Sequence, residues 1–163
     1  MLGMDHIELD ALHWGPNWEE PSLDIFREKV GQALAGNNWI TDGNYGKARD
    51  IIWNRADTLI WLDYPLPIIL WRLVWRTLRR VITRETLWHG NTESLYDQFF
   101  THESLIYYAL STHQRRRNTF LELLRNEQYP HLSVITHHHP RQTEAWLKEL
   151  SSAQQSESEQ HDS

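Results

Sequence analysis

The sequence alternates short apolar runs with longer amphipathic segments, and this alternation constrains the fold more than any other feature. Four runs have the length and the β-branched or aromatic content of strands: residues 6–9, 38–41, 58–63 and 132–136. Segments long enough to hold helices connect them, which predicts an α/β domain with a mainly parallel sheet. The run at 58–63 (TLIWLD) is continuous in residues typical of strands, β-branched and aromatic ones among them, which predicts a strand buried on both faces.

Apolar residues recur at helical spacing over 23–34, 67–82 and 141–150, and a short helix is predicted at 48–54. Residues 103–127 are predicted to be helical in two pieces. Two prolines and a Gly-Pro step predict a loop at 10–21, and residues 85–101 lack a clean period. We therefore expect one domain over residues 1–150. The Ser-, Gln- and acid-rich residues 151–163 are predicted to be a disordered polar tail.

Composition narrows the class of protein further. The 163 residues carry 22 acidic and 16 basic side chains, and the net charge of −6 argues against general binding to nucleic acid or to a membrane surface. With no cysteine, disulfides, thiolate zinc sites and cysteine nucleophiles are excluded. No apolar run reaches the roughly 18 residues of a membrane span, and residues 1–10 are too polar for a signal peptide. We expect a cytoplasmic protein with neither nucleic acid nor membrane as its partner.

Polar residues follow the predicted strands, and ligands of parallel sheets bind at the carboxyl ends of strands. Asp10 follows the first run, where a carboxylate can accept a proton from a substrate hydroxyl or hold a magnesium ion through water. A capping aspartate is the alternative. The second run ends in DGNY at 42–45, where Gly43 permits positive φ or close backbone approach. Asp42 and Asn44 could orient a metal-bound water or a substrate there, and an ordinary Asp-Gly turn is the alternative. Residues 63–65 (DYP) end the third run.

The helix predicted at 67–82 carries arginines on one side. Arg72, Arg76 and Arg80 are spaced by four, and no acidic residue lies between 66 and 84. Guanidinium groups suit phosphate oxygens, so phosphate binding is one interpretation and a solvated helix face is the other. The consecutive arginines at 115–117 point in different directions, so at most two of them can reach one site.

Three further motifs give weaker signals. The adjacent histidines at 137–139 cannot all converge on one metal ion without an unusual loop, which favours coincidence or contact at the edge of a ligand. Trp71 and Trp75, one turn apart, are predicted to pack in the core or against a lid, and a platform on which a ligand stacks is the alternative. The step Gly46-Lys47 is not a phosphate-binding P-loop, because Thr41 stands where the first glycine is needed and Ala48 where Ser or Thr is needed.

The order of these motifs resembles a known family. Residues 6–14 (HIELDALHW) with 16–18 (PNW) look like the second-strand motif of the topology modulation proteins, which are adenylate-kinase-like P-loop NTPases. Residues 39–45 (WITDGNY) are similar to their W-[IV]-x-D-G-N-Y motif, and residues 56–65 with the arginine helix resemble their fourth strand and the helix after it. The resemblance covers nearly all of residues 5–150. It implies a three-layer parallel sheet in the order 2-3-1-4-5 with helices on both faces, of which this chain lacks the central first strand, the P-loop and the first helix.

The resemblance also implies roles for residues. Asp10, Arg76 and Arg80 would be catalytic, with Asp10 facing the acceptor and binding magnesium through water. The acceptor would contact Trp14, Asp42, Gly43, Asn44 and Tyr45. The nucleotide phosphates would be bound by Arg72 and Arg76, with Arg115 or Arg116 from the later helix. Residues 85–101 would form a lid-like segment.

Two functions follow as expectations. The first is a kinase: an ATP- and magnesium-dependent phosphotransferase acting on a nucleotide or a small hydroxylated acceptor, inactive or truncated as given because the Walker A loop is missing. The second is a non-catalytic, shortened protein that binds an acceptor or a protein partner, whose strand would complete the sheet. Whether the chain is an enzyme is therefore left open. An effect on DNA topology gains no support from the charge of −6.

Overall fold

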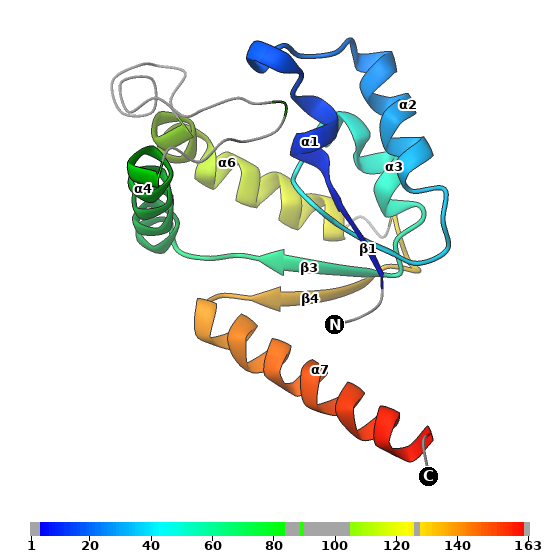
Figure 1. Cartoon of the computed structure of the whole chain (residues 1–163). Helices are drawn as coiled ribbons and strands as arrows, with labels where there is room; N and C mark the ends of the chain where they lie inside the picture. Colours follow the sequence, from blue (N-terminus) through cyan, green and yellow to red (C-terminus); the bar gives the residue numbers. More distant parts are fainter. Residues whose placement is uncertain (1–3, 84–88, 90–104, 126–127, 162–163) are drawn as a thin grey trace.

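The computed structural model describes residues 4–83, 89, 105–125 and 128–161 (Figure 1). Helices and strands alternate along this part of the chain, which confirms the α/β class. In chain order the elements are β1 (Asp5–Glu8), α1 (Leu9–His13), η1 (Pro16–Trp18), α2 (Leu23–Ala33), β2 (Trp39–Asp42), η2 (Gly46–Ala48), α3 (Arg49–Trp53), β3 (Thr58–Leu62), α4 (Leu66–Thr83), α6 (Leu105–Arg125), β4 (Ser133–His137) and α7 (Pro140–His161).

The strands form two separate parallel pairs. β1 pairs with β2 so that Glu8 lies beside Asp42, and β3 pairs with β4 so that Leu62 lies beside His137. The predicted parallel pairing is thus confirmed, whereas the described strands make two sheets of two strands and not one sheet. Because partners in a parallel pair end at the same edge, the segments after β1 and β2 are neighbours, and so are those after β3 and β4.

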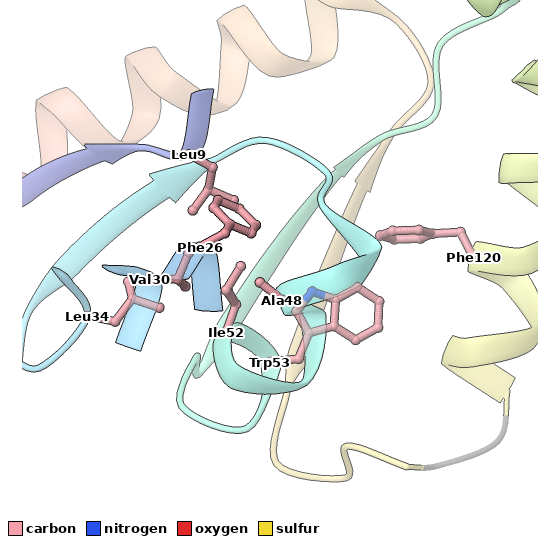
Figure 2. Packing of buried hydrophobic residues seen from close by; sticks show 8 residues of the cluster. All are labelled: Leu9, Phe26, Val30, Leu34, Ala48, Ile52, Trp53 and Phe120. Carbon is pink, nitrogen blue, oxygen red and sulfur yellow. The ribbon is translucent and has the colours of Figure 1, made fainter. Parts of the chain in front are cut away.

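The hydrophobic core lies between the strands and helices α2, α3 and α6 (Figure 2). Phe26 and Val30 of α2 and Leu34 at its C-cap repeat every four residues, so they lie on one side of the helix, and all three are fully buried. The Ser22 hydroxyl caps this helix by accepting a hydrogen bond from the Ile25 N–H at 3.4 Å. The buried members of the cluster are Leu9, Phe26, Val30, Leu34, Ala48, Ile52, Trp53 and Phe120.

β3 is covered on one face only, so the predicted burial on both faces is wrong. Trp61 packs on Phe120 of α6 with ring centroids 5.0 Å apart, while Ile60 and Leu62 on the other face are 41% and 49% exposed. α7 lies on this second face, but it contacts β4, where the Trp146 ring lies 5.6 Å from the His137 ring. Apolar side chains of β3 therefore remain open to solvent.

Three predicted boundaries differ from the structure. Residues 10–13, predicted to be a loop, belong to α1, and α6 is one helix where two pieces were predicted. α7 continues to His161, so its predicted end at residue 150 is wrong. No Gly or Pro interrupts the sequence after Pro140, and residues of fair helix propensity extend the helix without an apolar period. The segment 85–101 lies outside the described residues apart from His89.

Candidate functional site

The polar residues after β1 and β2 meet at one point. Asp10 lies in the first turn of α1, directly after β1, and Tyr45 follows β2. The Tyr45 hydroxyl donates a hydrogen bond of 2.5 Å to Asp10 Oδ1. Burial, followed by this hydrogen bond, raises the pKa of Tyr45, so the phenol remains a donor at neutral pH. Two motifs that lie 35 residues apart in the sequence therefore form one site.

Gly43 makes the close approach of these two segments feasible. Its φ of +117° is one that other residues rarely adopt, and a Cβ atom there would lie 3.1 Å from Leu9 Cβ. The neighbouring residues face elsewhere: Asn44 Oδ1 accepts a hydrogen bond of 3.4 Å from Arg49 Nη2, and Asp42 Oδ1 lies 3.6 Å from His6 Nε2. Of the side chains at 42–45, Tyr45 is the one hydrogen-bonded to Asp10.

His13 is part of this site, although the sequence did not single it out. Its buried ring lies 4.7 Å from Trp14, 4.9 Å from Phe26 and 4.7 Å from Tyr45, measured between ring centroids. Burial lowers the pKa of His13 despite the nearby Glu20, whose Oε2 is 3.7 Å from Nε2. Nδ1 has no hydrogen-bond partner among the described residues. No periodicity or spacing could have shown this, because two of the three rings around it, Phe26 and Tyr45, are distant in sequence.

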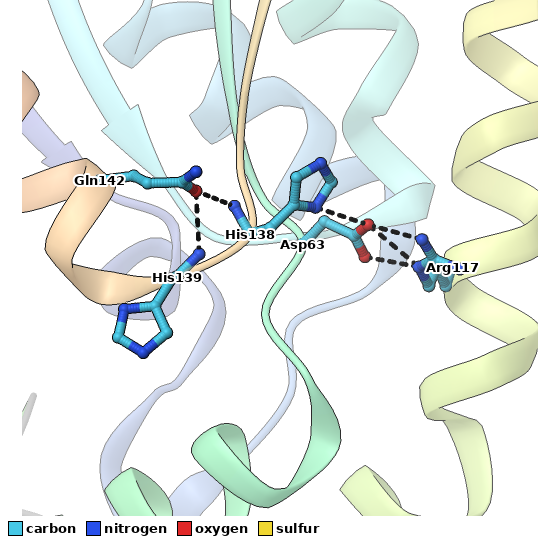
Figure 3. A network of polar contacts seen from close by, with 5 residues as sticks. All are labelled: Asp63, Arg117, His138, His139 and Gln142. Carbon is cyan, nitrogen blue, oxygen red and sulfur yellow. Dashed lines mark hydrogen bonds and ion pairs between the residues drawn. The ribbon is translucent and has the colours of Figure 1, made fainter.

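A second polar cluster lies where β3 and β4 end (Figure 3). Arg117 of α6 donates from Nε to Asp63 Oδ1 at 2.7 Å and from Nη2 to Oδ2 at 2.9 Å, and His138 Nδ1 lies 3.3 Å from Oδ2. The Asp63 side chain is only 4% exposed, and its hydrogen bond raises the pKa of Arg117. A pocket of about 290 Å³ adjoins this cluster. Its lining residues are Asp63, Tyr64, Pro65, His113, Gln114, Arg117 and His138.

The arginine that reaches this cluster is not one that the resemblance assigned. Arg115 and Arg116 are exposed, and the Arg116 guanidinium lies over the Tyr108 ring at 5.5 Å. Arg117 points to Asp63 because consecutive helix residues diverge by about 100°. The strand-end position of Asp63 was visible in the sequence, but its partner on α6 was not.

The three histidines at 137–139 have different partners. His137 Nδ1 lies 2.9 Å from Thr143 Oγ1, His138 pairs with Asp63, and His139 Nδ1 accepts the Arg141 backbone N–H at 3.2 Å. Among the described residues no three His, Asp or Glu side chains are placed to hold a metal ion. The three histidines are therefore not placed to share a metal ion, and the water-mediated magnesium contact that the resemblance implies for Asp10 stays a prediction.

The arginine helix α4 packs against α6, whereas Asp10 lies at the β1–β2 pair. Arg72 and Arg76 are exposed and Arg80 is half-buried. Trp71 and Trp75 are 68% and 63% exposed and stack on each other with centroids 6.2 Å apart, so the prediction that they pack in the core is wrong. The lid segment, the other predicted contact of these rings, lies outside the described residues apart from His89. No helix in the described part of the chain is long and apolar enough to cross a membrane.

Comparison of the chain with protein-family models, with curated proteins and with solved structures finds no match. The function must therefore be inferred from the chemistry of the site itself. Its chemical capability lies in Asp10: one carboxylate oxygen is held by Tyr45, and the second has no hydrogen-bond partner among the described residues. Such a carboxylate can accept a hydrogen bond or a proton from a hydroxyl group.

Proposed function

We propose that this chain provides the acceptor-binding part of an adenylate-kinase-like phosphotransferase, in which Asp10 accepts the proton of the acceptor hydroxyl. The observation that supports this most is the hydrogen bond by which Tyr45 fixes Asp10 at the carboxyl end of β1. A carboxylate held in one orientation suits general-base work, because proton transfer needs the base within hydrogen-bond reach of the hydroxyl. Nucleotides and small hydroxylated molecules are the acceptor classes.

Trp14 and Trp18 support an acceptor with an apolar or ring portion. Their ring centroids are 5.6 Å apart in an edge-to-face arrangement, and Trp14 also contacts His13 beside the site. Trp18 is 37% exposed, so part of its ring is available for contact. Aromatic side chains bind flat apolar groups through large contact areas at low entropic cost.

Phosphoryl transfer needs a group that binds the donor phosphates, and the sequence contains no Walker A loop. We therefore propose that activity requires a strand and a Gly-rich loop contributed by another polypeptide segment. The chain as given should bind ATP with magnesium no more tightly than about millimolar, because the backbone cradle is missing. Isothermal titration calorimetry checks this, and micromolar affinity would contradict it.

Acceptor binding can be tested on the chain itself. In an NMR titration with nucleoside monophosphates and small polyols, we expect amide shifts at residues 9–14 and 43–45. Asp10→Asn should weaken this binding about tenfold, since a charged hydrogen-bond acceptor is replaced by a weaker neutral amide oxygen. Asp24→Asn on the exposed face of α2 is the matched control and should have no effect. If no compound of either class shifts these amides, or if Asp10→Asn binds like the parent, the proposal fails.

Catalysis requires a second experiment on a chain extended by a strand, a GxxGxGK[ST] loop and a helix. In a version of that chain that transfers phosphate, Asp10→Asn should lower turnover by roughly 100-fold, the usual contribution of a general base. Unchanged turnover would remove Asp10 from this role.

The alternative function is a non-catalytic module that binds a protein strand, and the separation of the two sheets favours it. In the described part of the chain no backbone hydrogen bond reaches the second edge of β2 or of β3. Ile40, Ile60 and Leu62 on these strands are exposed. Two-stranded sheets are marginal alone, and an added strand would supply the missing hydrogen bonds. Hydrogen exchange tests this: the free-edge amides of β2 and β3 should exchange fast, and strong protection in the isolated chain would refute this candidate.

A further inference from the structure

The exposed side of α4 carries two adjacent rows of side chains that the proposed function does not use. Trp71, Trp75 and Ile82 form one row, and Arg72 and Arg79 form the other; together they are called the tryptophan–arginine face. Steps of four and seven residues bring side chains to the same side of a helix, so each row runs along the helix axis. The opposite side of α4 contains the buried Thr77 and packs on α6.

The apolar row is unusually open to solvent. Trp71 is 68%, Trp75 63% and Ile82 80% exposed, so three large apolar side chains lie on about three turns of helix. The two indole rings stack with an interplanar angle of 16°, which presents them as one flat apolar unit. Contiguous exposed apolar surface of this kind marks an interaction site more often than isolated exposed residues do.

The charge of α4 is opposite to that of the chain. Four of the 16 basic residues lie in its 18 residues, and none of the 22 acidic residues does. Within the described residues, the side chains of Arg72 and Arg79 form no hydrogen bond or ion pair. The face therefore offers cations beside an apolar row, and it calls for a partner that presents negative charge next to apolar material.

We propose that the tryptophan–arginine face docks on an anionic lipid bilayer. Tryptophan is the side chain most suited to the boundary between headgroups and acyl chains, and arginines beside it contact lipid phosphates. The 18-residue α4 lies with both rows on its exposed side, so both can reach one flat surface. The net charge of −6 predicts that an anionic bilayer repels the chain as a whole. Charges more than about 10 Å from the bilayer are largely screened at physiological salt, so the local charge of α4 decides.

A second copy of the chain is a poorer occupant. An antiparallel pair of α4 helices would set the arginine rows of both copies against each other, and any pairing of this face gathers positive charge without supplying negative charge, which disfavours the contact. Lipid phosphates supply the missing negative charge in a continuous layer. Charge complementarity thus selects the bilayer.

Sedimentation with lipid vesicles tests the proposal. Vesicles of phosphatidylcholine with about a third phosphatidylserine should bind the chain at least about tenfold more tightly than phosphatidylcholine alone, and added salt should weaken the binding. Trp71→Ala with Trp75→Ala, and separately Arg72→Gln with Arg79→Gln, should each lower binding about tenfold. Quenching of tryptophan fluorescence by brominated lipid should be lost when Trp71 and Trp75 are both changed to Phe.

Matched controls distinguish binding by this face from nonspecific adsorption of the protein to lipid. Leu23→Ala with Ile25→Ala removes two side chains that are each 49% exposed on α2, and Arg141→Gln removes an exposed arginine from α7. Both controls should bind vesicles like the parent, and circular dichroism should show that all variants are folded. Absence of binding to the anionic vesicles, equal binding to neutral ones, or parent-like binding of both α4 variants would each overturn the proposal. Self-association that the tryptophan variant abolishes, without vesicle binding, would assign the face to a second copy.

Discussion

Replacement of Gly43 by alanine tests the geometry that joins the two halves of the Asp10–Tyr45 site. Gly43 has a φ of +117°, where an L side chain is strained whatever the surrounding space. Its added Cβ would also lie 3.1 Å from Leu9 Cβ and 3.2 Å from Leu9 Cδ1. Leu9 is 1% exposed and belongs to the core, so it has little room to move away.

The cost has two parts. The unfavourable backbone conformation costs about 1–2 kcal/mol for a residue with a Cβ atom. Forcing an extra methyl group into a packed site costs about 1–3 kcal/mol. We therefore expect Gly43→Ala to lower the free energy of unfolding by about 2–5 kcal/mol, enough to reduce the melting temperature by about 2–4 °C for each kcal/mol.

Urea denaturation monitored by circular dichroism is the assay, with the slope against urea expected to stay unchanged. Gly31→Ala in α2 is the matched control: nothing lies within 4 Å of the added Cβ, and it should raise stability by about 0.5–1 kcal/mol because alanine favours helix. If Gly43→Ala stays within about 0.5 kcal/mol of the parent, the proposed strain at this turn is refuted.

Three further predictions concern neighbouring side chains. Tyr45→Phe removes the donor to Asp10 and should cost about 1.5–3 kcal/mol in urea denaturation; a change below about 0.5 kcal/mol would show that the hydrogen bond contributes little. Phe26→Ala should cost about 3–5 kcal/mol, because it leaves a cavity in the core, and a smaller loss would mean that the core collapses around it. Burial lowers the pKa of His13 in the folded chain, so the unfolded chain binds a proton at His13 more readily than the folded chain does. The folded state is therefore at its full stability above about pH 6.5 and loses stability as the pH falls and His13 becomes protonated. His13→Phe should therefore flatten the decrease in stability between about pH 7 and 5, and an unchanged pH profile would contradict this.

Local patterns in the sequence predicted most elements. The spacing of Phe26, Val30 and Leu34 gave α2, and the apolar runs gave all four strands within about a residue or two at each end. Errors occurred where burial depends on neighbours distant in the sequence. The apolar run at 58–63 is typical of a strand covered on both faces, but α7 covers β4 and leaves Ile60 and Leu62 open.

For the sites too, local sequence patterns were informative and contacts between distant residues could not be predicted. Asp10 and Tyr45 were named because each follows a strand, and their contact follows from the parallel pairing of β1 and β2. The pair formed by Asp63 and Arg117 could not be predicted, because three adjacent arginines differ only in the direction that the packing of α6 gives them. The assignment of particular arginines to phosphates stays a prediction.

The absence of a backbone ladder between β2 and β3 has a consequence for how the molecule opens. In the described part of the chain the two strand pairs are linked through side chains, with Phe120 of α6 contacting both Trp53 of α3 and Trp61 of β3. A side-chain contact is lost as soon as the two groups move a short distance apart, whereas a backbone ladder must lose its hydrogen bonds one after another. We therefore expect two cooperative unfolding units that meet at Phe120. In hydrogen exchange, the amides of β3 and β4 should exchange through an opening that leaves the core around α2 folded.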